Sequence, residues 1–105
     1  MTAKPKRART LRRESVRKAD ALGQSRERLF ELTPGGSPDK PIDVDSAAVV
    51  EIRARGVPCP RCGGEHAVEE HAAVSTHGER LRETRLRCRK CGSQRSLWFR
   101  LPVLN

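Results

Sequence analysis

CPRCGG at residues 59–64 and CRKCGS at residues 88–93 together contain every cysteine of this 105-residue chain. The resulting spacing is C-x2-C-x25-C-x2-C. In each C-x-x-C pair the backbone bends so that both sulfurs point at one place, and the following glycine, Gly63 or Gly92, allows a tight reversal. The pattern therefore predicts one metal site with four thiolate ligands, Cys59, Cys62, Cys88 and Cys91, and zinc is the expected cofactor as a single structural ion.

The composition indicates that the chain needs such a site in order to fold. Hydrophobic residues make up 35% and charged residues 33%, and the aromatic residues are two Phe and one Trp, with no Tyr. Chains with so few large apolar side chains form only a small core, and they usually depend on a disulfide, a metal or a partner. We therefore predict a small β fold stabilised by metal, in a single domain.

The same cysteines bear on the cellular location. No apolar run of roughly 7–15 residues follows the basic start, and nothing approaches the roughly 18 apolar residues of a membrane span. Thiols that stay in a reducing compartment remain free to bind metal. A cytoplasmic location is thus the default expectation, and no membrane association is expected.

The first 43 residues differ in composition from the remainder. Residues 1–9 are basic and lack apolar periodicity, which predicts a disordered arm. Residues 10–32 show a thin helical stripe, with Thr10 as a candidate cap, Gly23 as an interruption and Ser25 as a second cap. The stripe consists of Leu11, Ser15, Ala19, Leu22 and Leu29. We expect a basic extension at 1–33, partly helical or disordered, and a Pro/Gly-rich linker or long turn at 34–43.

Alternating residues predict β-strands in the remaining module, residues 44–105. Residues 42–55 read as a strand, because Val50, Ile52 and Ala54 alternate with charged side chains. A hairpin follows, with a turn at 76–79 where Gly78 can take a positive φ. We expect Val68, Ala72 and Val74 to share one of its faces. In the last strand, 94–101, Leu97, Phe99 and Leu101 face one side, and one of Trp98 and Phe99 is expected to enter the core.

These features resemble the zinc-ribbon family. The resemblance covers about residues 57–101: the CPRCG knuckle, a hairpin, the CRKCG knuckle and a strand with Trp98 and Phe99. It implies a three-stranded antiparallel ribbon whose four cysteines bind zinc. Zinc ribbons occur in transcription factors, RNA polymerase subunits, ribosomal proteins and replication proteins, so the family indicates the fold and the metal more than the function.

One functional subclass of the family can be tested against the hairpin tip. Ribbons of transcription elongation factors are similar in spacing but carry two adjacent acids at the tip, which assist transcript cleavage. Here the tip reads THGER at residues 76–80, with the single acid Glu79 beside an arginine. The pair Glu69-Glu70 lies within the first hairpin strand, where we expect it to face solvent. Cleavage activity is therefore not expected.

Three other readings of the cysteines remain open. A redox dithiol usually lies at a helix N-terminus, and neither pair is followed by a helical pattern. A catalytic zinc needs an open coordination position, which four cysteines would fill, although His66, His71 or His77 could replace one of them. Surface histidines on a hairpin are the simpler interpretation. Iron bound by four thiolates also remains an alternative. No catalytic constellation is present, so we expect no enzyme and no small-molecule substrate.

The net charge of +9 indicates a polyanionic partner. Residues 1–33 carry +6, residues 34–58 carry −1 and residues 59–105 carry +4. Arginine-rich surfaces neutralise phosphates and an aromatic side chain can stack on bases, which predicts nucleic-acid binding, to DNA or RNA. The candidate residues are Arg80, Arg82, Arg85, Arg87, Arg89, Lys90, Arg95 and Trp98. Two alternatives stand beside this hypothesis: a solvated charged face, and a protein-interaction adaptor that docks on a larger assembly.

Overall fold

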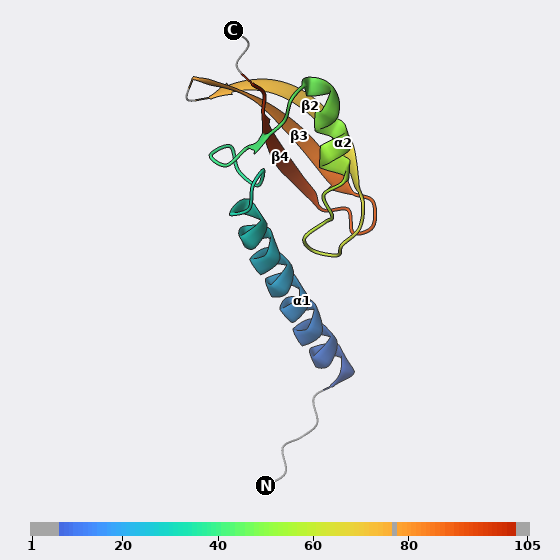
Figure 1. The fold of residues 1–105 in the computed structure, drawn as a ribbon. Helices are drawn as coiled ribbons and strands as arrows, with labels where there is room; N and C mark the ends of the chain where they lie inside the picture. The colour runs from blue at the N-terminus through green and yellow to red at the C-terminus, as the bar shows by residue number, and fades with distance from the viewer. Residues whose placement is uncertain (1–6, 77, 103–105) are drawn as a thin grey trace.

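The computed structural model of the protein describes residues 7–76 and 78–102. Figure 1 shows a long helix that runs away from a sheet, with a short helix on one sheet face. The elements in chain order are α1 (Ala8–Glu31), β1 (Ile42–Asp43), a 3-10 turn (Ala47–Val49), α2 (Val50–Arg55), β2 (His66–Thr76), β3 (Glu79–Cys88) and β4 (Gln94–Arg100). Residues 1–6, most of the predicted arm, and His77 lie outside the described residues.

The sheet has four strands in the order β1-β4-β3-β2. Strands β2, β3 and β4 are antiparallel neighbours, as predicted for a ribbon. The short β1 adds to the free edge of β4 in parallel, with Ile42 opposite Phe99. The prediction of a purely antiparallel, three-stranded module is therefore correct for the hairpin and last strand, but the complete sheet is mixed.

A β-bulge sets which side chains of β2 reach the core. Val68 pairs with Leu86, but Glu70 pairs with Arg85, so one extra residue is inserted between them. Paired residues point to the same sheet face, and the insertion reverses the alternation. Val68 thus lies on the core face, whereas Val74, opposite Leu81, lies on the outer face. The prediction that Val68, Ala72 and Val74 share a face is wrong for this reason.

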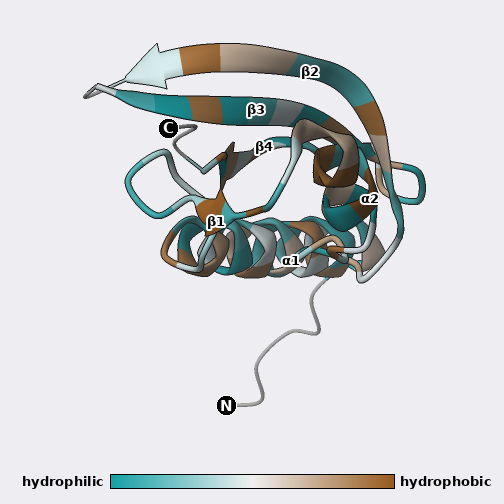
Figure 2. Cartoon of the chain, turned by 45° about the horizontal axis from the view of Figure 1, so that its top comes forward, coloured by the Kyte–Doolittle hydropathy of each residue, from teal (hydrophilic) through white to brown (hydrophobic). Residues whose placement is uncertain are grey.

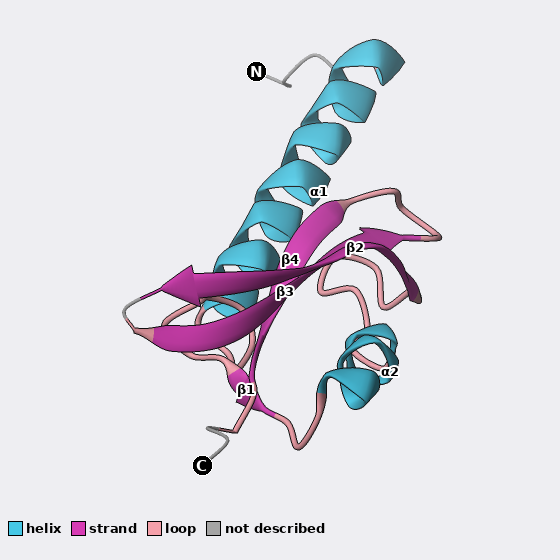
Figure 3. Cartoon of the chain, turned by 90° about the horizontal axis from the view of Figure 1, so that it is seen from above, coloured by secondary structure: helices cyan, strands magenta, loops and turns pink. Residues whose placement is uncertain are grey.

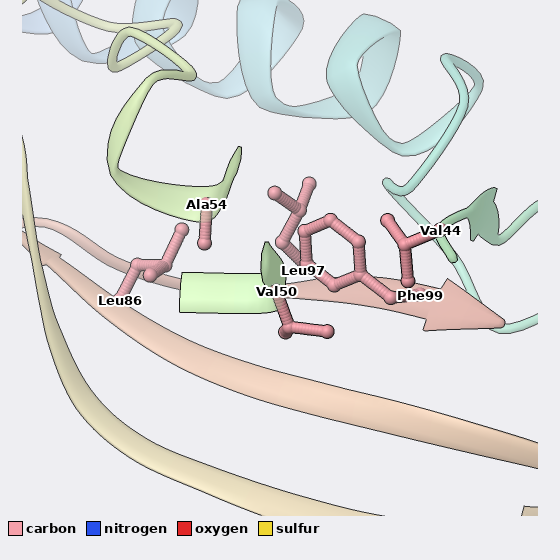
Figure 4. Packing of buried hydrophobic residues seen from close by; sticks show 6 residues of the cluster. All are labelled: Val44, Val50, Ala54, Leu86, Leu97 and Phe99. Carbon is pink, nitrogen blue, oxygen red and sulfur yellow. The ribbon is translucent and has the colours of Figure 1, made fainter. Parts of the chain in front are cut away.

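The core lies between β4, β3 and α2. Figure 4 shows the six side chains of the cluster facing one another: Val44, Val50, Ala54, Leu86, Leu97 and Phe99. Phe99 is fully buried, whereas Trp98, on the opposite face of the strand, is half-buried. This confirms the expectation that one of the two aromatic residues enters the core. Because the core is so small, apolar burial alone contributes little to the stability of the fold.

The segment 42–55 is mostly helical, which corrects the strand prediction. Figure 3 shows α2 as a helix beside the sheet, and only Ile42 and Asp43 form a strand. Val50 and Ala54 are both fully buried, and they lie four residues apart on one side of the helix, whereas Ile52 is 63% exposed. A strand would have buried Ile52 with the other two. The spacing of Val50 and Ala54 therefore fits either period, and packing against the sheet selects the helix.

Helix α1 is continuous over 24 residues. It begins at Ala8, so Thr10 lies inside the helix and is not its cap, and Ser25 caps no second turn. Gly23 does not interrupt it; Gly23 is the one buried residue of α1, and a Cβ there would lie 3.0 Å from the Arg61 guanidinium. The leucines of the predicted stripe are at least half exposed, and Figure 2 shows hydrophobic residues interspersed with hydrophilic ones along the helix.

The Pro/Gly-rich stretch forms a long turn that packs against β4. The Gly35 carbonyl accepts a hydrogen bond from the Trp98 backbone N–H at 2.8 Å. Gly35 is buried, has φ +86°, and approaches Ile42 and Leu97 so closely that a Cβ there would lie 2.6 Å and 3.0 Å from their side chains. The turn thus joins α1 to the edge of the sheet. Within the described residues, no helix has the length and apolar character that a membrane span requires.

Candidate metal centre

The two cysteine knuckles have the same backbone hydrogen-bond pattern. In the first, the Cys59 N–H donates to the Gly64 carbonyl at 2.9 Å and the Gly63 N–H donates to the Cys59 carbonyl at 2.7 Å. In the second, the Cys88 N–H donates to the Ser93 carbonyl at 2.9 Å and the Gly92 N–H donates to the Cys88 carbonyl at 3.0 Å. Gly63 and Gly92 have φ of +74° and +76°, which confirms their predicted role in the turns. Each knuckle precedes a strand, β2 or β4, and the second also ends β3.

The four sulfurs form one cluster. All four Sγ atoms lie within 4.8 Å of one another, the Cys59 and Cys91 sulfurs at 3.7 Å and the Cys62 and Cys88 sulfurs at 3.3 Å. These separations exclude a disulfide, whose sulfurs are about 2.05 Å apart. A tetrahedron with metal–sulfur bonds of about 2.3 Å has edges of about 3.8 Å. The cluster fits a four-coordinate metal ion, and the four cysteines can bind one.

Hydrogen bonds to the cysteine sulfurs also favour metal binding, because they stabilise the thiolate form. The Gly64 N–H faces the Cys62 sulfur, and the Lys90 and Cys91 N–H groups face the Cys88 sulfur, each at 3.4 Å. Such donors stabilise thiolates and lower their pKa. The pKa of Cys88 lies below its usual range because of the hydrogen bond from the Cys91 N–H in particular.

The thiols nevertheless cannot all ionise easily side by side. Burial raises the pKa of Cys59, but hydrogen bonds from Ser93 and backbone N–H groups outweigh it and lower that pKa to about 5. At Cys62 the Gly64 N–H lowers the pKa, but the neighbouring thiols, Cys88 first, and burial together outweigh this and raise it to about 11. Four thiolates at this spacing repel one another, so a cation among them is what allows the whole set to ionise.

A polar network connects the cluster to α1. The Ser93 hydroxyl lies 3.0 Å from the Cys91 sulfur and accepts a hydrogen bond from Arg95 at 2.8 Å. Arg95 also forms an ion pair with Glu27 of α1, and its side chain is only 4% exposed. Arg61 of the first knuckle donates to the same Glu27 carboxylate at 3.2 Å. The long helix is therefore held against the metal centre by one carboxylate and two arginines.

His66 belongs to this network and not to the surface. It is 1% exposed, its Nδ1 lies 2.7 Å from the Val57 carbonyl, and its Nε2 contacts Arg95. A proton on Nδ1 satisfies both contacts, because Nε2 then accepts from the guanidinium. The simpler sequence interpretation, a surface histidine, is wrong here. Glu27 and Ser93 were not predicted from the sequence, since one of four acids in a basic helix and a serine after a glycine carry no distinctive signal.

The predicted nucleic-acid residues do not form one surface. Arg95 is buried and its guanidinium is occupied, so it is not exposed to a phosphate. Arg85 and Arg87 lie on the outer face and form ion pairs with Glu70 and Glu69, at 3.6 Å and 3.2 Å. Trp98 shares this outer face, but the remaining candidates lie elsewhere: Arg80 and Arg82 towards the hairpin tip, and Arg89 and Lys90 in the second knuckle.

Gly64 lies where the first knuckle packs against the second, and it provides a test of the cluster. A Cβ on Gly64 would lie 2.8 Å from the Lys90 Cβ and 3.1 Å from the Cys88 sulfur. Because the Lys90 Cβ is fixed by its backbone, Gly64→Ala must push the knuckles apart. We expect its metal affinity, measured by competition with a chromophoric chelator, to fall about 10–100-fold. Gly56→Ala is the control, since its Cβ meets nothing closer than 3.4 Å; equal affinities of the two variants would contradict this expectation.

Comparisons with protein-family models, with curated proteins and with solved structures found no match to this chain. The assignment of the site therefore depends on its own residues.

Proposed function

We propose that this protein is a zinc-ribbon module that binds nucleic acid and catalyses no reaction. The four-thiolate cluster supports a structural role for the metal. Four protein ligands fill a tetrahedral shell and leave no position for a substrate or a reactive water. Zinc is the proposed ion, because thiolates are the soft ligands it prefers and its tetrahedral geometry matches the sulfur spacing.

The distribution of charge carries the nucleic-acid part of the proposal. Of the 20 Lys and Arg residues that the structure describes, five form ion pairs with described carboxylates: Arg61, Arg85, Arg87, Arg95 and Arg100. The other 15 described cations have no such pair. Even with the formal charge of −2 for one zinc and four thiolates, the chain would keep a charge of about +7. An excess of this size favours binding to a polyanion.

The proposal is tested by gel-shift titration with single- and double-stranded DNA and RNA at two salt concentrations. Phosphate contacts release counterions, so log affinity falls linearly with log salt, by about 0.9 for each phosphate on duplex DNA. We expect retardation at low salt and a steep loss at high salt. If the folded, metal-loaded protein retards none of these probes at low salt, the nucleic-acid function is wrong.

One observation favours an adaptor as the second candidate function. Leu11, Leu22 and Leu29 are 52%, 52% and 63% exposed on α1. Apolar side chains on an exposed helix can pack into a groove of a partner protein. Binding of this kind depends little on salt, so complex formation that persists at high salt would favour the adaptor over the nucleic-acid function.

A further inference from the structure

Unpaired positive charge is concentrated in one part of the molecule, the first half of α1. The segment from Arg7 to Lys18, which we term the basic segment, has six cations and a single acid, Glu14; the cations are Arg7, Arg9, Arg12, Arg13, Arg17 and Lys18. All six are exposed. None of these six forms an ion pair with a carboxylate among the described residues, in contrast to Arg85 and Arg87 on the sheet.

The arrangement of these cations destabilises the helix when no anionic partner is bound. The helix has no side-chain cap at its N-terminus and no acid in its first turn, although Arg7 and Arg9 lie there. Cations near a helix N-terminus oppose the helix dipole. Arg9, Arg13 and Arg17 follow one another at four-residue steps, where like charges repel. An anionic partner along the segment would remove both penalties.

The cations also encircle most of the helix. Successive residues turn about 100° around a helix axis, so Arg12, Arg9, Arg13, Arg17 and Lys18 spread over about two thirds of the circumference. A flat anionic surface, such as a membrane or an acidic protein face, would contact only one side of such a helix. A groove with charged walls on both sides would contact most of it.

Among nucleic acids, duplex DNA fits this arrangement. The B-DNA major groove is about 12 Å wide, accepts an α-helix and has a phosphate backbone on each side. The major groove of A-form RNA is too narrow for a helix, and single strands bind by stacking on aromatic side chains. The described helix from Arg7 to Gly23 has no aromatic residue.

We propose that the basic segment of α1 binds in the major groove of duplex DNA, with its arginines on the phosphates of both walls. This inference rests on the nucleic-acid function proposed above. The metal centre would act as the support of the helix, because Glu27 and Gly23, further along α1, contact Arg95 and Arg61 of the metal-binding module. Figure 1 shows the start of α1 well clear of the sheet, so a duplex bound to this part of the helix would not meet the strands.

The test compares two triple variants of equal charge on a duplex DNA of about 20 base pairs. Arg9→Gln/Arg13→Gln/Arg17→Gln removes three cations from the basic segment. Arg28→Gln/Arg53→Gln/Arg55→Gln removes three exposed cations elsewhere. With both variants checked as folded by amide dispersion, we expect the first to reduce the salt slope by about 2.7, at about 0.9 per phosphate contact, and the second to leave it nearly unchanged.

A modified probe tests the groove. A duplex whose major groove is filled by glucosylated hydroxymethylcytosine should bind at least tenfold more weakly than the unmodified duplex, and a minor-groove ligand should not displace the protein. Equal losses in the two triple variants, equal binding to the glucosylated duplex, or preference for single strands or duplex RNA would overturn the inference and leave the proposed function standing. A wild-type protein that binds no nucleic acid would overturn both.

Discussion

Removal of the metal by a chelator at neutral pH is expected to unfold the β-sheet. The core cluster has six buried side chains, of which only Phe99 is large and aromatic. The knuckles connect β2, β3 and β4, and their four thiolates repel one another without a cation between them. Metal binding in comparable four-ligand sites is worth about 10–16 kcal/mol, which is as large as the whole stability of a typical small domain, about 5–15 kcal/mol. The measurement is amide dispersion in NMR before and after chelation.

Metal identity and two variants complete this test. Elemental analysis is expected to give one zinc per chain, whereas a red, iron-containing protein would favour the iron alternative. Cys88→Ser should behave like the chelated protein, because it removes a buried ligand. Ser93→Ala, which keeps all four ligands, is the matched control and should remain folded. A chelated protein that keeps its hairpin amide dispersion would show that apolar packing alone supports the sheet.

The metal cluster was predictable from sequence because its signal is local. Two C-x-x-C-G knuckles are each specified within five residues, and the intervening 25 residues suit a single hairpin. The alternation in residues 94–101 likewise put Leu97 and Phe99 on one face, and both are buried in the core, since β4 has a regular period. Where backbone geometry is determined by neighbours in sequence, the pattern and the structure agree.

Three features could not be predicted, because they depend on contacts between distant residues. Val50 and Ala54 become helical through packing against the sheet, although their spacing also fits a strand. Gly23 stays inside α1, where Arg61 packs on it from 38 positions further along the chain. Arg95 was expected on the surface, yet it is buried by Glu27 and His66, and neither partner adjoins it in sequence. Propensities are weak where such contacts decide the outcome.

The ion pair between Glu27 and Arg95 gives the second large expected effect. Arg95 is 4% exposed, so Glu27→Gln would leave a buried guanidinium without its carboxylate partner. Breaking one partner of a buried pair typically costs about 3–5 kcal/mol. We expect a loss in that range in denaturant unfolding of the metal-loaded protein. Glu70→Gln is the matched control, because the Arg85–Glu70 pair is 64% and 58% exposed and surface pairs contribute about 0–1 kcal/mol.

The stability difference between wild type and Glu27→Gln depends on pH, and this dependence shows whether Glu27 acts through its charge or through packing. Burial raises the pKa of Glu27, but hydrogen bonds and charge from Arg95 and Arg61 outweigh it and hold the pKa below its ordinary range. The folded state therefore binds fewer protons than the unfolded state, and the stabilisation by Glu27 is complete above about pH 4.5 and lost as the pH falls through the folded pKa. The stability difference between wild type and Glu27→Gln should thus be constant from about pH 7 to about pH 5.5 and shrink below about pH 4.5. Thiolate protonation weakens metal binding in both proteins, so the comparison is made with metal in excess, where both remain folded. A difference that stays constant below pH 4.5 would mean that Glu27 acts through packing and not through its charge.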